Sequence, residues 1–285
     1  MNIKRVLPKK AILSLWEWGF RERSYELAVR GHSTMSFIMK YIILFLLLIP
    51  SIVFANNEGT KELKLKKLSD NVYQHISYKR VEPWGLIGAS GLVVINGTEA
   101  HMIDTPWTTQ GTKQLIEWIE AKGLTIKSAV VTHFHEDASG DIPLLNDLKI
   151  KTYATSLTNK LLKLNQKEVS SDEISSNTFE FIDGVASVFY PGAGHTEDNI
   201  VVWLPNEKIL FGGCFVKSLK NKNLGYTGDA NISEWPNSMQ KVINRYPDAK
   251  LVVPGHGEVG DVSLLKHTQA LALSAAASNK KINKD

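Results

Sequence analysis

The stretch Val130-Val-Thr-His133-Phe-His135-Glu-Asp137 joins an apolar run to two imidazoles and a carboxylate at alternating positions. Alternation with period two places these three side chains on one side of an extended segment, where they can converge on a metal ion. A lone histidine in a loop is usually a surface or core residue, whereas a His-x-His-x-Asp run directly after a strand is typical of a metal site. The stretch therefore predicts a metal centre at the end of a strand.

Three later segments repeat the order of apolar run, glycine turn and potential ligand. They are Val188-Phe-Tyr-Pro-Gly-Ala-Gly-His195, Ile209-Leu-Phe-Gly-Gly-Cys214 and Leu251-Val-Val-Pro-Gly-His256. Strand ends on one edge of a sheet assembly are neighbours in space, and glycine lets the backbone turn sharply there. The four segments together supply four histidines, one aspartate and one cysteine, which suit two Zn²⁺ ions at bond lengths of about 2.0 to 2.3 Å.

Cys214 is the only cysteine in the chain, so it cannot form an internal disulfide. In an exported protein it would be a thiol open to oxidation unless it is buried or bound to metal. The glycines that precede it favour metal binding. By contrast, His75, His101 and His267 lack such surroundings and are interpreted as structural or surface residues.

Residues 39–55 have the pattern of a secretory signal, with a basic start, an apolar stretch and small residues before a cleavage site after Ala55. A membrane anchor is the alternative, but the roughly 15 apolar residues, interrupted by Pro50, are fewer than the roughly 20 that a spanning helix needs. We therefore expect residues 1–55 to be an N-terminal extension plus signal peptide, with Met1, Met35 or Met39 as the translation start. Residues 56–285 are expected to form a single compact domain.

The positive charge of the chain belongs to this leader. The 285 residues carry a formal net charge of +4. Residues 1–55 hold eight of the 33 Lys and Arg and three of the 29 Asp and Glu, which leaves 25 and 26, a net charge of −1. A chain that is 43% hydrophobic is not a disordered protein. We expect a periplasmic monomer that binds no nucleic acid and, after signal cleavage, has no stable membrane association.

Strand-like and helix-like segments alternate through the remaining sequence. The expected strands are 63–68, 72–78, 91–95, 100–103, 128–132, 152–154, 186–190, 200–204, 208–211 and 251–253. The expected helices are 109–122, 141–148, 157–164, one opened by Ser233, and 262–277. Strands in two groups, each followed by helices, predict an α/β fold of two packed β-sheets with helices on the outer faces.

Six motifs of the chain form a pattern that one family shares. They are Asp104-Thr-Pro-Trp107, His133-Phe-His-Glu-Asp137, Pro191-Gly-Ala-Gly-His195-Thr-Glu-Asp-Asn199, Phe211-Gly-Gly-Cys214-Phe-Val-Lys217, Gly228-Asp-Ala-Asn231 and Pro254-Gly-His-Gly257. With them, residues 60–280 resemble the subclass B1 metallo-β-lactamases, in the pattern of the IMP-type and related acquired carbapenemases. The resemblance implies an αβ/βα sandwich with metals in a groove at one edge. Other branches of the superfamily use an aspartate between the metals where this chain has Cys214.

The resemblance also implies the ligand sets. One zinc would be bound by His133, His135 and His195, and the other by Asp137, Cys214 and His256. Asp137 would further orient the zinc-bound hydroxide that attacks the lactam carbonyl. Asp104 matches a carboxylate that fixes the orientation of a ligating imidazole; its alternative is a turn or helix cap before Pro106.

Three residues would contact the substrate by the same resemblance. Lys217 matches the lysine that binds the carboxylate of a β-lactam, with ordinary surface charge as the alternative. Trp84, within the segment Val81–Gly88, matches the apolar tip of a mobile hairpin that closes over substrate, and otherwise it is a packed aromatic. Tyr226 stands where many relatives have an asparagine that contacts the lactam carbonyl. Tyrosine is longer, so the carbonyl would depend mainly on zinc.

The function that the resemblance implies is that of a class B β-lactamase. It would use zinc to hydrolyse the amide bond of penicillins, cephalosporins and carbapenems and so give antibiotic resistance. Two alternatives stay open from the residues alone: a thioesterase or other hydrolase of the same superfamily, and a non-catalytic zinc-binding protein.

Overall fold

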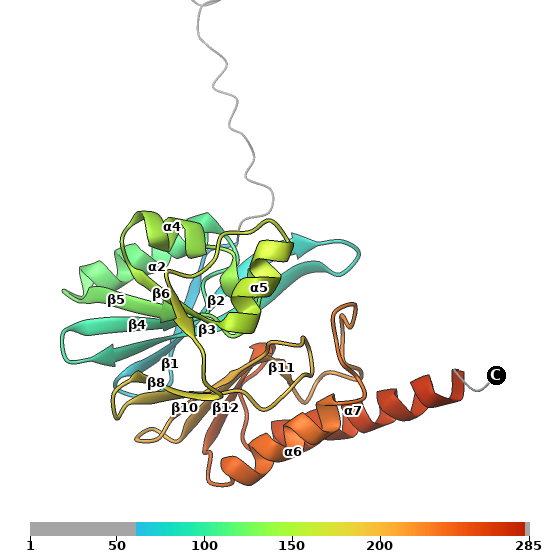
Figure 1. Cartoon of the computed structure of the whole chain (residues 1–285). Coiled ribbons are helices and arrows are strands. Elements are labelled where there is room, and N and C mark those ends of the chain that lie inside the picture. The colour runs from blue at the N-terminus through green and yellow to red at the C-terminus, as the bar shows by residue number, and fades with distance from the viewer. Residues whose placement is uncertain (1–60, 283–285) are drawn as a thin grey trace, which may run out of the picture. The chain divides into compact units, whose positions relative to one another are not determined.

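Two β-sheets pack face to face, with helices on the outer side of each (Figure 1). The computed structural model describes residues 61–282. The predicted extension and signal peptide, residues 1–55, lie outside this range. Within it, no helix is both long and apolar enough to cross a membrane.

The first sheet contains seven strands in the order of the sequence. They are β1 Lys64–Lys67, β2 Val72–Val81, β3 Gly85–Asn96, β4 Glu99–Ile103, β5 Thr125–Val130, β6 Lys151–Thr155 and β7 Asp172–Ile174. Strands β1 to β4 pair antiparallel and strands β4 to β7 pair parallel. Parallel neighbours need crossover connections. These contain the helices α2 Thr109–Ala121, α3 Glu136–Ser139, α4 Ile142–Asp147 and α5 Ser156–Leu164.

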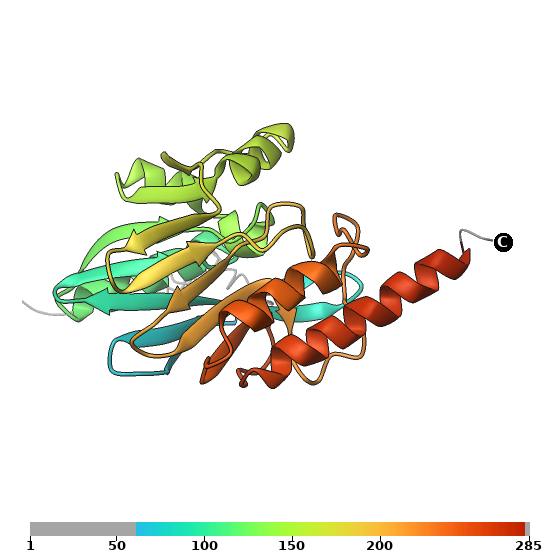
Figure 2. The same cartoon turned by 60° about the horizontal axis from the view of Figure 1, so that its bottom comes forward.

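The second sheet contains five strands in the order β12-β11-β10-β9-β8. They are β8 Thr178–Ile182, β9 Ala186–Phe189, β10 Val201–Leu204, β11 Ile209–Lys217 and β12 Leu251–His256. Only β11 and β12 pair parallel, and the helix α6 Trp235–Arg245 lies in the connection between them. The last helix, α7 Ser263–Ile282, lies beside α6 (Figure 2).

Apolar side chains fill the space between the sheets. Leu92 and Val130 of the first sheet belong to one cluster with Phe211 and Val253 of the second, and all four are fully buried. Burial of each such side chain contributes about 1.5–3 kcal/mol. Two further clusters join each sheet to its own helices, α2 on the first sheet and α6 with α7 on the second. This layering holds fixed the strand ends that carry the predicted ligands.

The structure has the predicted α/β architecture, with three short elements that the sequence did not indicate. They are β7, β8 and α3. Strand β7 has three residues, two of them acidic, and it pairs only at the edge of the first sheet, so it carries no apolar pattern. Helix α3 is a single turn of four residues, too short for a helical period to show.

The hairpin between β2 and β3 is longer than the sequence indicated. Pairing continues from Tyr78 opposite Gly88 to Val81 opposite Gly85. Most of the predicted mobile segment, residues 81–88, is therefore an extension of the first sheet. Only residues 82–84 form the turn, and Trp84 at its tip is 58% exposed.

Candidate metal centre

The segment after β5 carries three of the predicted ligands, but it is not extended throughout as predicted. Helix α3 begins directly after His135, its N-cap residue, so Asp137 lies in a helical turn. His133 lies before the helix, so the loop and the first turn of α3 together bring Asp137 toward it. His133 Nε2 lies 3.5 Å from Asp137 Oδ1. The convergence predicted from alternation is thus produced by a loop and a turn of helix.

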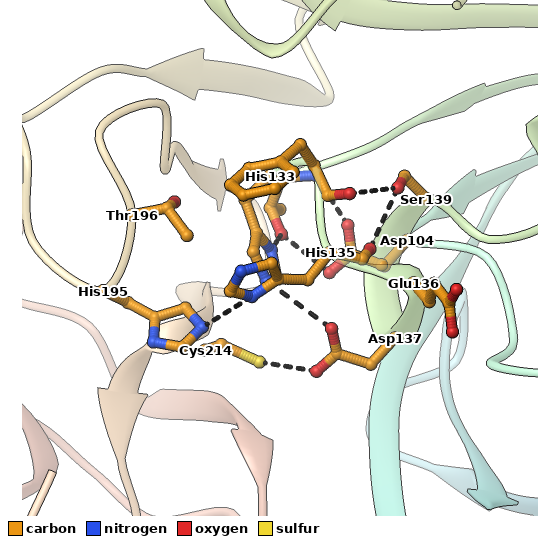
Figure 3. A network of polar contacts seen from close by, with 12 residues as sticks. Asp104, His133, His135, Glu136, Asp137, Ser139, His195, Thr196 and Cys214 are labelled. Carbon is orange, nitrogen blue, oxygen red and sulfur yellow. Dashed lines mark hydrogen bonds and ion pairs between the residues drawn. The ribbon is translucent and has the colours of Figure 1, made fainter. Parts of the chain in front are cut away.

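The second sheet supplies the other three predicted ligands. His195 lies in the loop after β9, and His256 is the last residue of β12. Cys214 lies within β11 and not beyond it as predicted, because that strand continues to Lys217. The pairing of β11 with β12 is irregular on both sides of Gly213. Such an irregularity can redirect a side chain, and Cys214 points to the centre from here (Figure 3).

Three histidines form one half of the centre (Figure 3). His135 Nδ1 lies 3.2 Å from His195 Nε2. The rings of His133, His135 and His195 meet edge to face, with centroids 4.9, 5.0 and 5.1 Å apart. Three ring nitrogens from two different sheets therefore gather at one place.

Asp137, Cys214 and His256 form the other half. Asp137 Oδ2 lies 3.0 Å from both Cys214 Sγ and His256 Nε2, and the sulfur lies 3.3 Å from the same nitrogen. The ligand atoms of His133 and Cys214 lie within 4.8 Å of each other, so the two halves are adjacent. Asp137 connects them, because its second carboxylate oxygen faces His133.

Hydrogen bonds on the far side of three imidazoles fix which ring nitrogen faces the centre. Asp229 Oδ2 accepts from His135 Nε2 at 2.9 Å, and the Gly88 carbonyl accepts from His256 Nδ1 at 2.8 Å. The Thr132 hydroxyl lies 3.3 Å from His133 Nδ1. Each bond leaves a nitrogen lone pair directed at the centre, the arrangement that metal-binding histidines generally show.

Asp104 acts on this arrangement through Thr132. Its carboxylate accepts from the Thr132 backbone N–H at 2.6 Å and from the Thr132 hydroxyl at 2.8 Å. The hydroxyl, having donated to Asp104, accepts from His133. Within residues 61–282 the hydrogen bonds of the Asp104 carboxylate go to Thr132, so any effect on the orientation of His133 passes through that residue. It adopts a left-handed backbone with φ of 60°, and its carbonyl accepts from His75 Nε2 at 3.2 Å.

The electrostatics of the centre favour neutral imidazoles beside a negative carboxylate. Burial lowers the pKa of His133 to about 3 and holds that of His195 well below its ordinary value. Burial alone would raise the pKa of Asp137, but contacts with His256, His133 and Cys214 hold it well below its usual range. Burial, with the nearby Asp137 charge, raises the pKa of the Cys214 thiol well above its ordinary value. A thiolate at Cys214 therefore requires a cation at the centre.

The donor set fits zinc. His133 Nε2 is buried and has no hydrogen-bond partner within residues 61–282, although buried polar atoms are normally paired. A metal ion would satisfy it. Imidazole nitrogen together with a cysteine sulfur favours Zn²⁺ over magnesium or calcium, which prefer oxygen ligands.

Asp229 is a site residue that sequence reasoning did not assign. It lies within the motif Gly228-Asp-Ala-Asn231, where it accepts hydrogen bonds from His135 Nε2 and, at 3.2 Å, from the Tyr226 hydroxyl. The segment has no regular secondary structure, so no periodicity pointed to it. An acidic residue beside glycine in a shared motif was the only available signal.

The three predicted substrate residues differ in depth. Lys217 ends β11 and is only 7% exposed, and burial lowers the pKa of its ammonium. Tyr226 is 51% exposed, and its ring lies 5.9 Å from that of His135. Trp84 stands at the tip of the β2–β3 hairpin, whose strand β3 reaches the centre through the contact between Gly88 and His256.

The three histidines interpreted as structural or surface residues make other contacts. His75 holds the Asp104 carbonyl, His101 Nδ1 lies 2.8 Å from Ser128 Oγ, and His267 Nε2 donates to the Asn221 carbonyl at 2.8 Å. None of them belongs to the groups of potential metal ligands found within the described part of the chain.

Replacing Cys214 with serine is expected to weaken binding of one metal ion at least about tenfold. A serine hydroxyl stays protonated at neutral pH and is a harder donor than a thiolate. Metal analysis after dialysis against graded zinc concentrations, with the wild type treated in parallel, would measure the loss. Equal metal content in the two proteins would remove Cys214 from the ligand set.

A sandwich of two sheets with six nitrogen, sulfur and carboxylate donors at one edge defines a metal-dependent hydrolase. Residues 83–256 match the family model described as the metallo-beta-lactamase superfamily. The chain belongs to this family, and within it to the subclass B1 enzymes, which are class B β-lactamases.

Known relatives cover most of the chain. A type 2 metallo-beta-lactamase of Pseudomonas aeruginosa is 43% identical over 229 residues, 80% of this chain and 92% of its own. The crystal structure of the DIM-1 metallo-beta-lactamase exposed to ceftazidime has a TM-score of 0.76 and 49% identity, over 76% of this chain and 100% of that one. The FIM-1 enzyme of Pseudomonas aeruginosa, solved in its mono-zinc form, has a TM-score of 0.73 and 32% identity, over 76% and 98% of the two chains.

Proposed function

We propose that this protein hydrolyses the amide bond of penicillins, cephalosporins and carbapenems with two zinc ions at the centre described above. The observation that carries the proposal is the cluster of Asp137, Cys214 and His256. Their ligand atoms lie 3.0 to 3.3 Å apart, beside three histidines whose nitrogens face the same place. The cysteine also separates this centre from superfamily branches that place an aspartate between the metals.

The residues divide into two ligand sets in this proposal. One zinc is assigned to His133, His135 and His195, and the other to Asp137, Cys214 and His256. Zinc bound there would supply Lewis acidity, which polarises a carbonyl oxygen and lowers the pKa of a bound water to about 7. The protein's own part is to direct the imidazole lone pairs inward, through Thr132, Asp229 and the Gly88 carbonyl.

Asp137 orients the attacking water. Its carboxylate stays ionised at neutral pH, because its neighbours hold the pKa of that group well below its usual range. An ionised carboxylate accepts a hydrogen bond from water and so directs the oxygen lone pair at the lactam carbonyl. Its position between the two ligand sets places this acceptor at the middle of the centre.

The substrate is held by a cation and an apolar lid in this proposal. Lys217 binds the carboxylate that β-lactams carry near the lactam nitrogen. Trp84, exposed at the hairpin tip, closes over the substrate and excludes water. The Tyr226 hydroxyl already donates to Asp229, so we assign Tyr226 a contact through its ring and not a hydrogen bond to the lactam carbonyl.

We further propose that the protein acts in the periplasm as a monomer, after cleavage behind Ala55. The signal pattern of residues 39–55 supports export. Amino-terminal sequencing of the periplasmic protein is expected to begin at Asn56, and light scattering after size exclusion is expected to give the mass of one mature chain. A retained leader would contradict the first expectation, and a dimer mass the second.

Hydrolysis of a chromogenic cephalosporin tests the function. Purified protein is expected to open the lactam, to lose this activity with a chelator and to regain it on addition of zinc, with metal content measured on the same preparation. No turnover at full zinc loading would overturn the proposal and favour a non-catalytic zinc protein. Turnover of a thioester, without turnover of any lactam, would favour the other hydrolase.

A further inference from the structure

The indole of Trp235 and the ammonium of Lys217 form a buried pair beside the metal centre. Lys217 Nζ lies 5.3 Å from the ring centroid of Trp235. Trp235 is fully buried and Lys217 is 7% exposed. The two residues come from different elements, α6 and β11, so their contact depends on how that helix packs on the second sheet.

The Trp235 ring lies against the ammonium, while Cys214 and Asp137 attract it only at longer range. Among residues 61–282, no carboxylate forms an ion pair with Lys217, and its Nζ donates no hydrogen bond. An isolated buried charge is costly unless it is compensated. The face of an indole attracts a cation more strongly than that of tyrosine or phenylalanine, and the attraction is larger where water is excluded. Trp235 therefore adds a contact that stabilises this ammonium before substrate arrives, beside the longer-range attraction of Cys214 and Asp137.

The indole is itself held in place. Its Nε1–H donates to the Phe215 carbonyl at 3.1 Å, and its ring stacks on the Phe215 ring at 6.0 Å with an interplanar angle of 17°. Glycine at position 194 makes this packing possible, because a Cβ there would lie 2.4 Å from the Phe215 ring and 3.1 Å from Trp235 Cδ1. The ring thus has little freedom to move with the lysine.

The backbone of Lys217 is held in place independently of its ammonium. Its backbone N–H donates to Thr268 Oγ1 of α7 at 2.8 Å. With the backbone fixed on one side and the ammonium resting on the indole, the lysine side chain is confined between α6 and the metal centre. A long flexible side chain that is already confined loses less conformational entropy when it binds an anion.

We infer that Trp235 is a positioning residue for substrate recognition, which holds the Lys217 ammonium where it meets the carboxylate of a β-lactam. The inference rests on the proposed function. Trp235 supplies no ligand atom to the centre, although its ring lies 5.9 Å from that of His195. Its effect should therefore appear in the discrimination between carboxylated and uncharged substrates.

The test compares a penicillin with its own methyl ester, which lacks the negative charge. Trp235→Met, which fills space without an aromatic face, is expected to lower the acid-to-ester ratio of kcat/KM roughly tenfold, through KM for the acid. The kcat for either form should stay within about twofold of wild type. Trp235→Phe, which keeps a weaker aromatic face, should lower the ratio only about threefold.

Two controls separate positioning from general loss of packing. Trp203→Leu removes an indole that packs against the same hydrophobic cluster but does not contact Lys217, and it should leave the ratio unchanged. In a Lys217→Ala background, Trp235→Met should lower the ratio no further, because the two residues act as a unit. A ratio that falls equally in Trp203→Leu, or falls again in the Lys217→Ala background, overturns the inference.

A binding measurement gives a second readout without turnover. Calorimetric titration of the zinc-loaded protein with ring-opened penicillin, which retains the carboxylate, is expected to show roughly tenfold weaker binding for Trp235→Met at equal zinc content. If that variant does not fold, Trp235→Phe carries the test, and an unchanged ratio and affinity overturn the inference. Turnover of the uncharged ester reports the hydrolytic function itself. Failure of the proposed function would abolish this turnover, whereas failure of the inference about Trp235 would leave it intact.

Discussion

Asp137→Asn is expected to lower kcat for β-lactam hydrolysis by at least about a hundredfold and to release one metal ion. Mutation of a residue that only holds a metal ligand in place already lowers metal affinity or activity about 10–100-fold. Asp137 contacts Cys214, His256 and His133 directly. An amide cannot carry the negative charge that offsets a divalent cation here. It also presents a donor where the attacking water needs an acceptor.

Single-turnover kinetics and metal analysis on the same sample would measure both effects. Asp70→Asn makes the same change at an exposed carboxylate that, among the described residues, pairs only with Lys67, and it should leave kcat and metal content as in wild type. If Asp137→Asn kept full activity, Asp137 would be neither a ligand nor the group that orients water. Lost activity with full metal content would leave only the second role.

Lys217→Glu is expected to raise KM for a carboxylated β-lactam about a hundredfold, with a smaller effect on kcat. Removing a charge partner at a buried site costs about 3–5 kcal/mol. Water solvates the free substrate carboxylate, so the measured effect is smaller than this. We expect about 2.7 kcal/mol, which is a hundredfold in KM. Because the new charge repels the carboxylate, the effect should nearly vanish for the methyl ester.

Steady-state kinetics with the acid and the ester would check this expectation. Lys266→Glu reverses a charge on the exposed face of α7, so it controls for the change in net charge. A KM for the acid that is unchanged in Lys217→Glu would remove Lys217 from the substrate site. An equal rise in KM for acid and ester would indicate lost folding or lost metal and not lost recognition.

Much of the site could be predicted because its ligands sit in short local patterns. His133, His135 and Asp137 are neighbours in sequence, and each of the other three follows an apolar run and glycines. The backbone that presents them was predicted less well. Asp137 lies in α3 and Cys214 within β11, because hydrogen bonding to neighbouring elements, and not the local pattern, sets where a strand or helix ends.

The partners that fix the ligands could not be predicted, since they are remote in sequence. Asp229 is 94 residues from His135, and Gly88 is 168 residues from His256. The contact between Lys217 and Trp235 has the same character, because it depends on how α6 packs on the second sheet. Side-chain chemistry identified Lys217 as a cation, but nothing in its neighbourhood along the chain indicated an indole beneath it.

The sequence by itself determined which chemical groups are available, in what local order, and hence the metal, the family and the reaction class. Tertiary structure alone decided that six donors share one place. His135 and His195 are 60 residues apart, and Asp137 and Cys214 are 77 apart. Residues so far apart in the sequence meet only when the two sheets bury their apolar faces against each other. This burial is a non-local contribution that no single segment carries alone.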